Sequence, residues 1–284
     1  MTETERTLIA QQPLFAPLAA ALAAFHALPA SCSDLNAYVD RMAQGPVSGG
    51  GMPIRFVAPA SGHLCYEQRV FSRGEVETRA DNWHDFFNAL VWLTFPRIKA
   101  ALNRRHHEAL TGQRAGEPAR RGPVRDAATQ FDECGVVVIS ADAGLLDLLQ
   151  AHRWRELFWD RRGDVVRHLG VFVVGHALYD QLRTPFVGLC GKALLVELPQ
   201  NSWASSSFQV EAVDEAVACL LADAAAYARP RQFQPLPLLG IPGAVLDNAR
   251  AEYYADGRQF RPARTGGERA LRVRVELTRT AMVG

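Results

Sequence analysis

The pattern of hydrophobic and polar positions divides the chain into short helices and strands around one unusually apolar helix. That helix lies in RADNWHDFFNALVWLTFPRIKAALN, residues 79–103. Hydrophobic residues cover most of its helical circumference, which is typical of a helix that is buried on several sides. Pro96 removes a helical hydrogen bond, so the pattern predicts either a kink or a second helix that begins at Pro96.

Apolar residues at helical spacing predict the remaining helices. These span residues 13–28, 33–43, 125–133, 142–161 and 209–228. The segment VVRHLGVFVVGHALYDQL, residues 165–182, fits either a buried helix or a strand that leads into a helix. Periodicity does not separate the two, and we favour the helix.

Strands are expected where β-branched residues run together or alternate with polar residues. The predicted strands are 54–57, 64–71, 135–140, 191–198 and 271–277. Glycine and proline predict loops at 46–53 and 111–124 and an extended segment at 230–243. We therefore expect an α+β fold, a mainly helical single domain with a small mixed β-sheet. It would span residues 12–264, with terminal extensions at 1–11 and 265–284.

Composition narrows the class of protein without naming a function. Hydrophobic residues make up 48% of the 284 positions and the formal net charge is +1, so no overall charge calls for nucleic acid or an acidic membrane surface. The five cysteines are far apart in the sequence, which favours a reducing compartment, and we expect a cytoplasmic location. No uncharged stretch reaches the ~20 apolar residues of a membrane span.

The polar residues at the start of the apolar helix need an explanation. Asp81 is the expected N-cap, and Asp85 would lie near the positive end of the helix dipole. His84 and Asn88 are four residues apart and share one face of the helix, but capping does not account for them. A buried polar group without a partner costs ~1–3 kcal/mol, so we expect partners elsewhere in the chain.

Three other segments offer such partners. The first is VRDAATQFDECG, where carboxylates lie just before a predicted strand, and the second is VVGHALYDQL. The third is YEQR, at residues 66–69. Their candidate residues are Tyr66, Glu67, Arg69, Arg125, Asp126, Asp132, Glu133, His176, Tyr179 and Asp180.

Several of these blocks carry a family resemblance. The stretches TRADNWHDFFNALVWLTFPRIKAALN, RDAATQFDECGVVVIS, VVGHALYDQL and GLCGKALLVEL resemble a proteobacterial domain family of unknown function. The resemblance covers about residues 12–264. The resemblance indicates that these blocks are characteristic of the family. It implies no reaction, because the family has no established activity.

The first functional hypothesis is a metal-assisted hydrolase that acts on a small-molecule substrate. Imidazole and carboxylate groups suit a divalent ion such as zinc, manganese or iron, which would be the one cofactor. The expected metal ligands are His84, Asp126 and His176. The expected catalytic residues are His84, Asp85, Asn88, Asp132 and Glu133, and the expected binding residues are Arg69, Lys99, Arg125 and Tyr179.

Two alternatives remain open at this stage. The basic stretch 97–125 suits a module that binds a phosphate-bearing ligand or nucleic acid, although it has no aromatic residue between Phe95 and Phe131 for base stacking. A non-catalytic protein is the other alternative, since a buried polar cluster can serve only to fix packing. The sequence sets no oligomeric state and gives no reason to expect a membrane partner.

Overall fold

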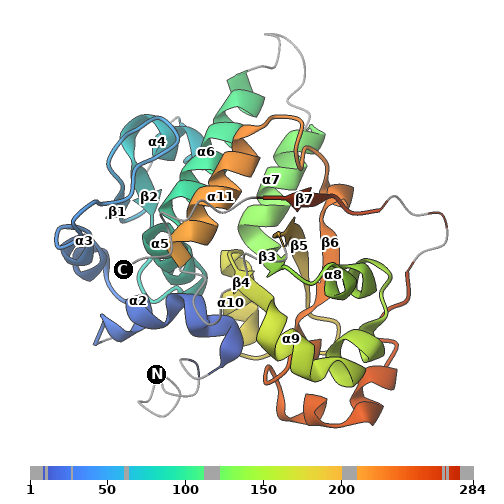
Figure 1. The fold of residues 1–284 in the computed structure, drawn as a ribbon. Coiled ribbons are helices and arrows are strands. Elements are labelled where there is room, and N and C mark those ends of the chain that lie inside the picture. The colour runs from blue at the N-terminus through green and yellow to red at the C-terminus, as the bar shows by residue number, and fades with distance from the viewer. Residues whose placement is uncertain are drawn as a thin grey trace.

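The chain folds as a mainly helical α+β protein, as the sequence predicts (Figure 1). The computed structural model describes residues 9, 12–26, 28–60, 64–111, 122–199, 210–263, 266 and 269–275. Within these residues there is one five-stranded mixed sheet and one two-stranded parallel sheet. None of the described helices is both long and apolar enough to span a membrane.

The larger sheet is built on two parallel strands, β3 (Gly135–Ser140) and β5 (Cys190–Glu197). All six residues of β3 are buried, which explains its continuous run of β-branched residues. Around this pair, β4 (Leu169–Val173) lies antiparallel to β3, and β6 (Gln234–Pro237) lies antiparallel to β5. The late strand β7 (Arg272–Arg274) pairs with β5 in parallel, within the predicted strand 271–277.

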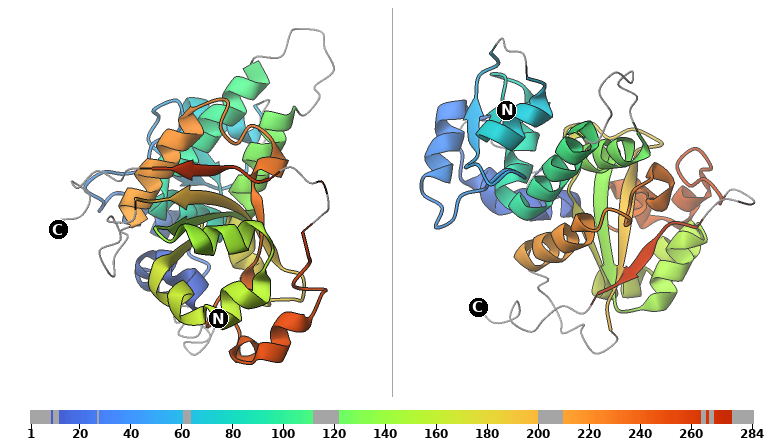
Figure 2. Two further views of the ribbon diagram at one scale, coloured as in Figure 1. Left: turned by 45° about the vertical axis from the view of Figure 1, so that its right-hand side comes forward. Right: turned by 90° about the horizontal axis from the view of Figure 1, so that it is seen from above.

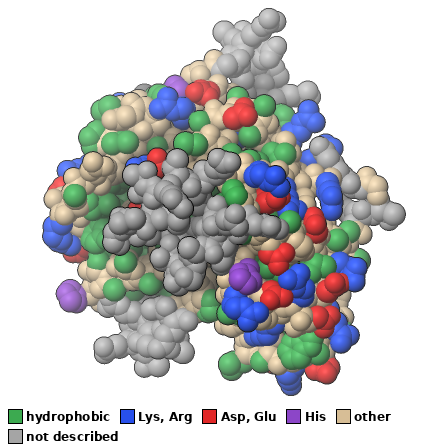
Figure 3. Space-filling model, in the orientation of Figure 1, with side chains coloured by type: hydrophobic (Ala, Val, Ile, Leu, Met, Phe, Trp, Pro, Cys, Tyr) green, Lys and Arg blue, Asp and Glu red, His purple; other side chains and the backbone are tan. Residues whose placement is uncertain are grey.

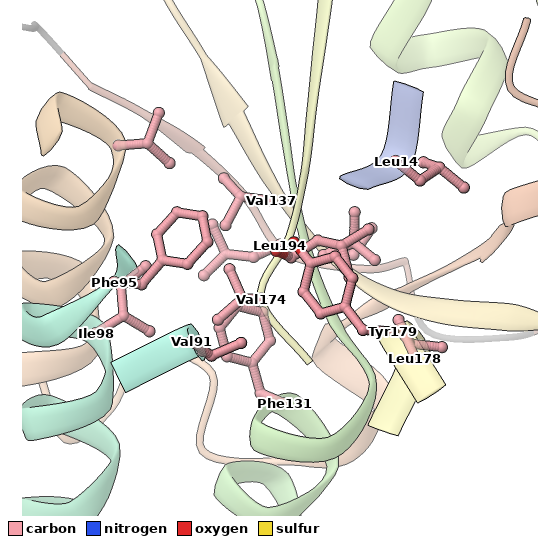
Figure 4. Packing of buried hydrophobic residues seen from close by; sticks show 14 of the residues in the cluster. Leu14, Val91, Phe95, Ile98, Phe131, Val137, Val174, Leu178, Tyr179 and Leu194 are labelled. Carbon is pink, nitrogen blue, oxygen red and sulfur yellow. Dashed lines mark hydrogen bonds between the residues drawn. The ribbon is translucent and has the colours of Figure 1, made fainter. Parts of the chain in front are cut away.

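Helices cover both faces of this sheet (Figure 2). One layer holds α5 (Trp83–Thr94), α6 (Pro96–Thr111), α7 (Pro123–Cys134) and α11 (Val210–Ala222). The opposite layer holds α8 (Ala143–Gln150) and α9 (Arg162–His168). Figure 4 shows side chains from the first layer, including Phe95 and Phe131, packed around Val137 and Leu194 of the sheet.

A smaller lobe precedes α5 in the chain. Its sheet pairs β1 (Arg55–Val57) with β2 (Glu75–Glu77), and α3 (Cys32–Val39) packs against β1. The predicted helix 13–28 is a 3₁₀ turn, η1 (Pro13–Leu18), followed by α2 (Ala19–Ala23). The predicted loop 111–124 falls mainly on residues outside the described part of the chain.

The predicted strand at 64–71 is wrong, because this segment forms α4 (Tyr66–Arg73). The side chain of Gln68 accepts the backbone N–H of Cys65 at its start. Gly74 ends it in the left-handed conformation with φ of 71°, where an added Cβ would lie 2.0 Å from the carbonyl oxygen of Pro53. The alternation in HLCYEQRVF also places Tyr66 and Val70 four residues apart, a spacing that equally fits one face of a helix.

The favoured helix over 165–182 is also wrong, and the alternative of a strand that leads into a helix is correct. α9 ends at His168, β4 follows, and α10 (His176–Leu182) begins after Gly175. An added Cβ on Gly175 would meet backbone atoms of Glu133, Cys134 and Gly135 within 2.6 Å. The close approach of these two segments therefore breaks the apolar run and brings α10 beside the end of α7.

The predicted helix 142–161 is interrupted after α8. His152 has a left-handed φ of 54°, and a π-helical turn, η2 (Glu156–Asp160), follows it. Among the described residues after α11 there are four 3₁₀ turns, η4 (Pro230–Gln232), η5 (Leu238–Gly240), η6 (Leu246–Ala249) and η7 (Ala251–Ala255). Acidic and basic side chains intermix over the region of α8 and α9 in Figure 3, as expected of a solvated face.

Helices α6 and α11 cap each other. Asp214 of α11 accepts the backbone N–H groups of Arg97 and Ile98, 2.9 and 2.8 Å away, at the first turn of α6. In return, Arg105 of α6 donates to the backbone carbonyl of Leu221 in the last turn of α11, at 2.5 Å, and to that of Ala226 in the turn that follows, at 2.6 Å. Asp214 places a carboxylate at the N-terminus of α6, and Arg105 places a positive charge at the C-terminus of α11, which are the signs that the two helix dipoles favour. They fix the position of α6, which carries several residues of the site described below.

The Asp214 cap gives a pH-dependent contribution to stability. Burial raises the pKa of Asp214 from its ordinary 3.8 to about 6, against the two backbone N–H donors and the charge of Arg97. The folded chain therefore holds a proton that the unfolded chain releases, and this contribution falls as the pH rises from about 4 to about 6.

We predict that Asp214→Asn removes this pH dependence. At ~1.4 kcal/mol per pH unit, the variant should gain up to about 3 kcal/mol relative to the wild type between pH 4 and pH 7. Urea unfolding of both proteins across this range measures the difference. A constant difference in unfolding free energy at every pH would contradict the raised pKa.

Candidate functional site

One cavity of about 400 Å³ lies where α4, α5, α6, α7 and α10 meet. Its lining is mainly polar and includes most of the polar block at the start of α5. The lining residues are Pro59, Tyr66, Glu67, Glu77, Arg79, His84, Asp85, Asn88, His106, Thr129, Asp132, Glu133 and His176. The five residues expected to be catalytic are all in this set.

The start of α5 differs from the expected capping arrangement. Asn82, and not Asp81, is the N-cap, and its side-chain oxygen accepts the backbone N–H of Asp85 at 2.9 Å. Asp81 precedes it in a left-handed conformation with φ of 53°. The carboxylate of Asp85 accepts two hydrogen bonds from the guanidinium of Arg79 and one from the backbone N–H of Arg79. Burial alone would raise the pKa of Asp85, but these bonds with Arg79 hold it below its ordinary value.

A buried ammonium group joins the helices behind the cavity. Lys99 of α6 is 3% exposed and donates to the Oδ1 atom of Asn88, 2.9 Å away, and to the carboxylate of Asp132. Because Lys99 can only donate, the Asn88 amide must turn its oxygen towards it. The Asn88 nitrogen then donates to the hydroxyl oxygen of Tyr66 at 2.9 Å. This chain of contacts links α4, α5, α6 and α7.

Three potential metal ligands converge at one end of the cavity. The Nε2 atoms of His84 and His176 are 3.2 Å apart, and Glu133 Oε2 lies 3.5 Å from His176 Nε2. One ligand atom from each of the three residues lies within 4.8 Å of the other two. His84 and His176 are two of the predicted metal ligands, and Glu133 completes this group in the place expected for Asp126.

The charge states of these groups follow from burial and from one another. Burial lowers the pKa of His176 to about 3, against the neighbouring charge of Asp132, so the imidazole is neutral at pH 7. Burial and the charge of Asp132 raise the pKa of Glu133. Burial would also raise the pKa of Asp132, but Lys99 and His176 hold it below the ordinary value. A cation between the histidines and Glu133 would therefore relieve an unfavourable concentration of negative charge.

Another part of the cavity wall is formed by α4 and α6. The side-chain nitrogen of Asn103 donates to the carboxylate of Glu67 and to its backbone carbonyl, both at 3.0 Å. His106 lies three residues after Asn103 on the same face of α6. Tyr66 and Glu67 belong to the YEQR segment that was expected to contribute partners, but neither they nor His106 were predicted as catalytic, binding or metal-ligating residues. The spacing of Lys99, Asn103 and His106, at i, i+4 and i+7, is the signal that would have found this face.

The remaining expected residues have other roles in the structure. Arg69 is buried and forms ion pairs with Glu75 and Glu77, so it contacts the cavity only through Glu77. The Tyr179 hydroxyl donates to the Val173 carbonyl at 2.6 Å, and its ring packs on Phe15 and Phe87. Tyr179 is therefore a core residue.

Arg125 and Asp126 lie in the first turn of α7, whereas the cavity residues of this helix, Thr129, Asp132 and Glu133, lie in its later turns. In the basic stretch 97–125, Lys99 and Arg105 are turned inward to Asp132 and to the end of α11. Arg114, Arg120 and Arg121 fall outside the described residues.

The Lys99–Asp132 pair gives a prediction for stability. Removal of one partner from a buried ion pair leaves the other charge uncompensated, at a typical cost of ~3–5 kcal/mol. We expect this loss for Lys99→Met in urea unfolding. Asp132→Asn in the same background should restore part of it, because the two changes are coupled.

Arg97→Met is the matched control. It lies on the same helix and breaks an exposed ion pair with Glu215, with a nitrogen–oxygen distance of 3.3 Å. Such a pair contributes at most ~1 kcal/mol. Equal losses for Lys99→Met and Arg97→Met would show that the buried pair does not organise the site.

Comparison with known proteins identifies the domain but gives it no activity. No curated protein and no solved structure matches the chain. A family model described as "Protein of unknown function (DUF3025)" matches residues 54–264, which is more than half of the chain and contains every cavity-lining residue. The start of the domain at residue 12 stays a prediction. The chain therefore belongs to the DUF3025 family of proteins of unknown function.

Proposed function

We propose that this protein binds one divalent metal ion through His84, Glu133 and His176 and uses it to hydrolyse a small-molecule substrate in the adjoining cavity. Two histidines and a glutamate are a ligand set of catalytic zinc sites, which keep a fourth position for water or substrate. The cavity beside the three side chains provides room for that position.

The spacing of the ligand atoms is the observation that carries this proposal. Ligands bonded to a tetrahedral zinc ion at ~2.0–2.1 Å lie roughly 3.3–3.4 Å from one another. The Nε2 atoms of His84 and His176 are 3.2 Å apart, and Glu133 Oε2 is 3.5 Å from His176 Nε2. Both separations match a shared ion.

A hydrogen bond between the two imidazoles explains less of this geometry. It would account for the 3.2 Å separation between His84 and His176. It would leave Glu133 without a role, because the His176 Nε2 atom has a single lone pair or proton to direct at one partner. A central ion satisfies all three atoms.

The surrounding residues suit a metal centre of this kind. Histidine ligands commonly direct their second nitrogen at a carboxylate, which fixes the orientation of the ring. The Nδ1 atom of His176 has no hydrogen-bond partner among the described residues, and the nearest carboxylate oxygen is Asp132 Oδ2 at 3.8 Å. Lys99 holds this carboxylate from the other side.

A bound divalent ion would polarise a carbonyl or phosphoryl oxygen and lower the pKa of a bound water, which makes hydrolysis feasible at neutral pH. The protein's own side chains would orient the substrate beside the ion. Tyr66 accepts a hydrogen bond from Asn88, so its own hydroxyl proton is directed elsewhere. Because Tyr66 lines the cavity, this proton is available to an oxygen atom of the substrate.

The proposal predicts metal-dependent stabilisation. Metal-stripped protein should gain ~2.7 kcal/mol at one hundred times the Kd of a native ion, seen as a rise in Tm of roughly 5 °C. Zinc, manganese, magnesium and iron(II) are compared by thermal unfolding. Metal content after gel filtration gives the stoichiometry, which should be one ion per chain.

His84→Ala should abolish the rise, and the exposed His26→Ala serves as the control that keeps it. A rise retained in His84→Ala would place the metal elsewhere in the molecule. No rise with any of the four ions, in protein that remains folded, would refute the metal centre.

Hydrolysis is tested on the same proteins with chromogenic carboxylic esters, anilides and phosphate esters. Turnover should disappear on metal removal, return with the preferred ion and be lost in Glu133→Gln. Turnover that is equal in Glu133→Gln and the wild type would contradict the proposed centre. A metal that binds but supports no hydrolysis of any class would leave a metal site without the proposed reaction.

A further inference from the structure

Tyr66 lines the cavity, and the oxygen of its hydroxyl group faces hydrogen-bond donors. The side-chain nitrogen of Asn88 donates to this oxygen at 2.9 Å. The indole N–H of Trp92 lies near the same oxygen, outside hydrogen-bonding geometry. Among the described residues, no acceptor binds the hydroxyl proton of Tyr66. An oxygen atom of a ligand in the cavity can therefore accept a hydrogen bond from it.

The direction of the contact between Asn88 and Tyr66 is fixed by Lys99. The two polar side chains behind it are buried, with Lys99 3% and Asn88 7% exposed. An ammonium group only donates, so the Asn88 oxygen faces Lys99 at 2.9 Å and the Asn88 nitrogen faces Tyr66. If the amide turned over, its nitrogen would meet the ammonium, and two donors would face each other. The Tyr66 oxygen is therefore held as an acceptor, and its proton points away from Asn88.

Tyr66 shares the cavity with the proposed metal ligands. Asn88 follows His84 by four residues on the same face of α5, where Cβ atoms are ~5–6 Å apart. The charge of Asp132 acts on the Tyr66 hydroxyl, and the same carboxylate lies 3.8 Å from the Nδ1 atom of His176. In a cavity of about 400 Å³, one small molecule can contact the ion and the hydroxyl together.

The Tyr66 hydroxyl keeps its proton at neutral pH. Burial and the charges of Glu67 and Asp132 raise the pKa of Tyr66 above its ordinary value of 10. Tyr66 is therefore a hydrogen-bond donor and not a phenolate nucleophile or base. The N–H groups of Asn88 and Trp92 act in the opposite sense and favour negative charge on its oxygen. Hydrogen bonds in such a chain polarise one another, which strengthens the hydroxyl as a donor.

We propose that Tyr66 is a catalytic residue that donates a hydrogen bond to the substrate oxygen that gains negative charge during hydrolysis, and that Lys99, acting through Asn88, is its positioning residue. Water forms a bond to the carbonyl carbon of an ester or amide, and an electron pair of the double bond moves to the carbonyl oxygen. A donor aimed at this oxygen stabilises the charge that develops there. Tyr66 keeps its proton, so this role adds no proton transfer. The inference rests on the proposed metal centre.

The other charges of the cavity favour a carbonyl substrate over a phosphate ester. A phosphate group is negatively charged before it reacts, and clamps of Arg and Lys commonly stabilise its transfer. Arg79 is the only Lys or Arg among the described lining residues, and it already pairs with Asp85. A neutral carbonyl group needs no such cation and suits a single neutral donor. The substrate class is therefore a small carboxylic ester or amide.

Boronic acids test this inference by equilibrium binding and need no known substrate. A boronic acid is planar and neutral in solution. When it takes up hydroxide it becomes a tetrahedral anion, which resembles a carbonyl group to which water has added. Methane-, butane- and benzeneboronic acid are titrated by calorimetry into the metal-loaded full-length protein, and metal content is measured on each sample.

At least one boronic acid should bind the wild type about tenfold more tightly than Tyr66→Phe, the effect of one hydrogen bond to a charged group. Metal content should not change. Tyr38→Phe is the matched control and should keep the affinity, because Tyr38 is also half-buried but packs on Phe25 outside the cavity. On the ester or anilide that the wild type hydrolyses best, Tyr66→Phe should lower kcat about a hundredfold and leave KM unchanged.

Asn88→Asp tests the positioning role. The new carboxylate would still accept from Lys99, so the buried ammonium keeps its partners. It would also accept the hydroxyl proton of Tyr66 and draw it away from the cavity. Tyr66→Phe should therefore cost almost no further affinity in the Asn88→Asp background, against about tenfold in the wild type. This comparison cancels the general effect of the added negative charge.

Equal affinities of the wild type and Tyr66→Phe for every boronic acid would overturn the role of Tyr66 and leave the metal centre intact. So would a metal-loaded wild type that binds none of the three. A loss on Tyr66→Phe that persists undiminished in the Asn88→Asp background would overturn the positioning role. Turnover of phosphate esters alone would overturn the substrate class. Failure to load any metal would instead refute the proposed function, and this inference with it.

Discussion

The buried ammonium of Lys99 is the interaction on which the candidate site depends. A lysine this deeply buried requires acceptors, and it has two of them, the Asn88 oxygen and the Asp132 carboxylate. These acceptors come from α5 and α7, so one charged group fixes three helices relative to one another. Asn88 then orients Tyr66, and Asp132 lies beside His176. The geometry of the cavity follows from this arrangement.

Around the cavity, carboxylates outnumber the cationic side chains that pair with them. Lys99, Arg69 and Arg79 are each already paired with a carboxylate, whereas the lining carboxylates of Glu67 and Glu133 have no Lys or Arg partner among the described residues. Like charges in a buried site are unfavourable unless a counter-ion is present. A metal ion at His84, Glu133 and His176 would compensate the carboxylate of Glu133.

Local patterns predicted the elements that their own residues determine. The run of β-branched residues in GVVVIS predicted β3, and Pro96 starts a new helix as its geometry requires. The errors at 64–71 and 165–182 arise where tertiary contacts decide, through Gly74 against Pro53 and Gly175 against the end of α7. His84 and Asn88 were found because capping did not explain them, and His176 was found as a possible partner in the segment VVGHALYDQL. Glu133, and not Asp126, lies beside the two histidines, because the turn of α7 that reaches the cavity depends on packing that no sequence spacing records.

Anomalous scattering from a zinc-containing crystal tests the central claim most directly, because it locates the ion independently of activity and stability. Data recorded above and below the zinc absorption edge should give one peak per chain. The peak should lie ~2.0–2.2 Å from His84 Nε2, His176 Nε2 and a Glu133 oxygen. A well-ordered cavity without a peak, or a peak bound by other residues, would contradict the metal centre.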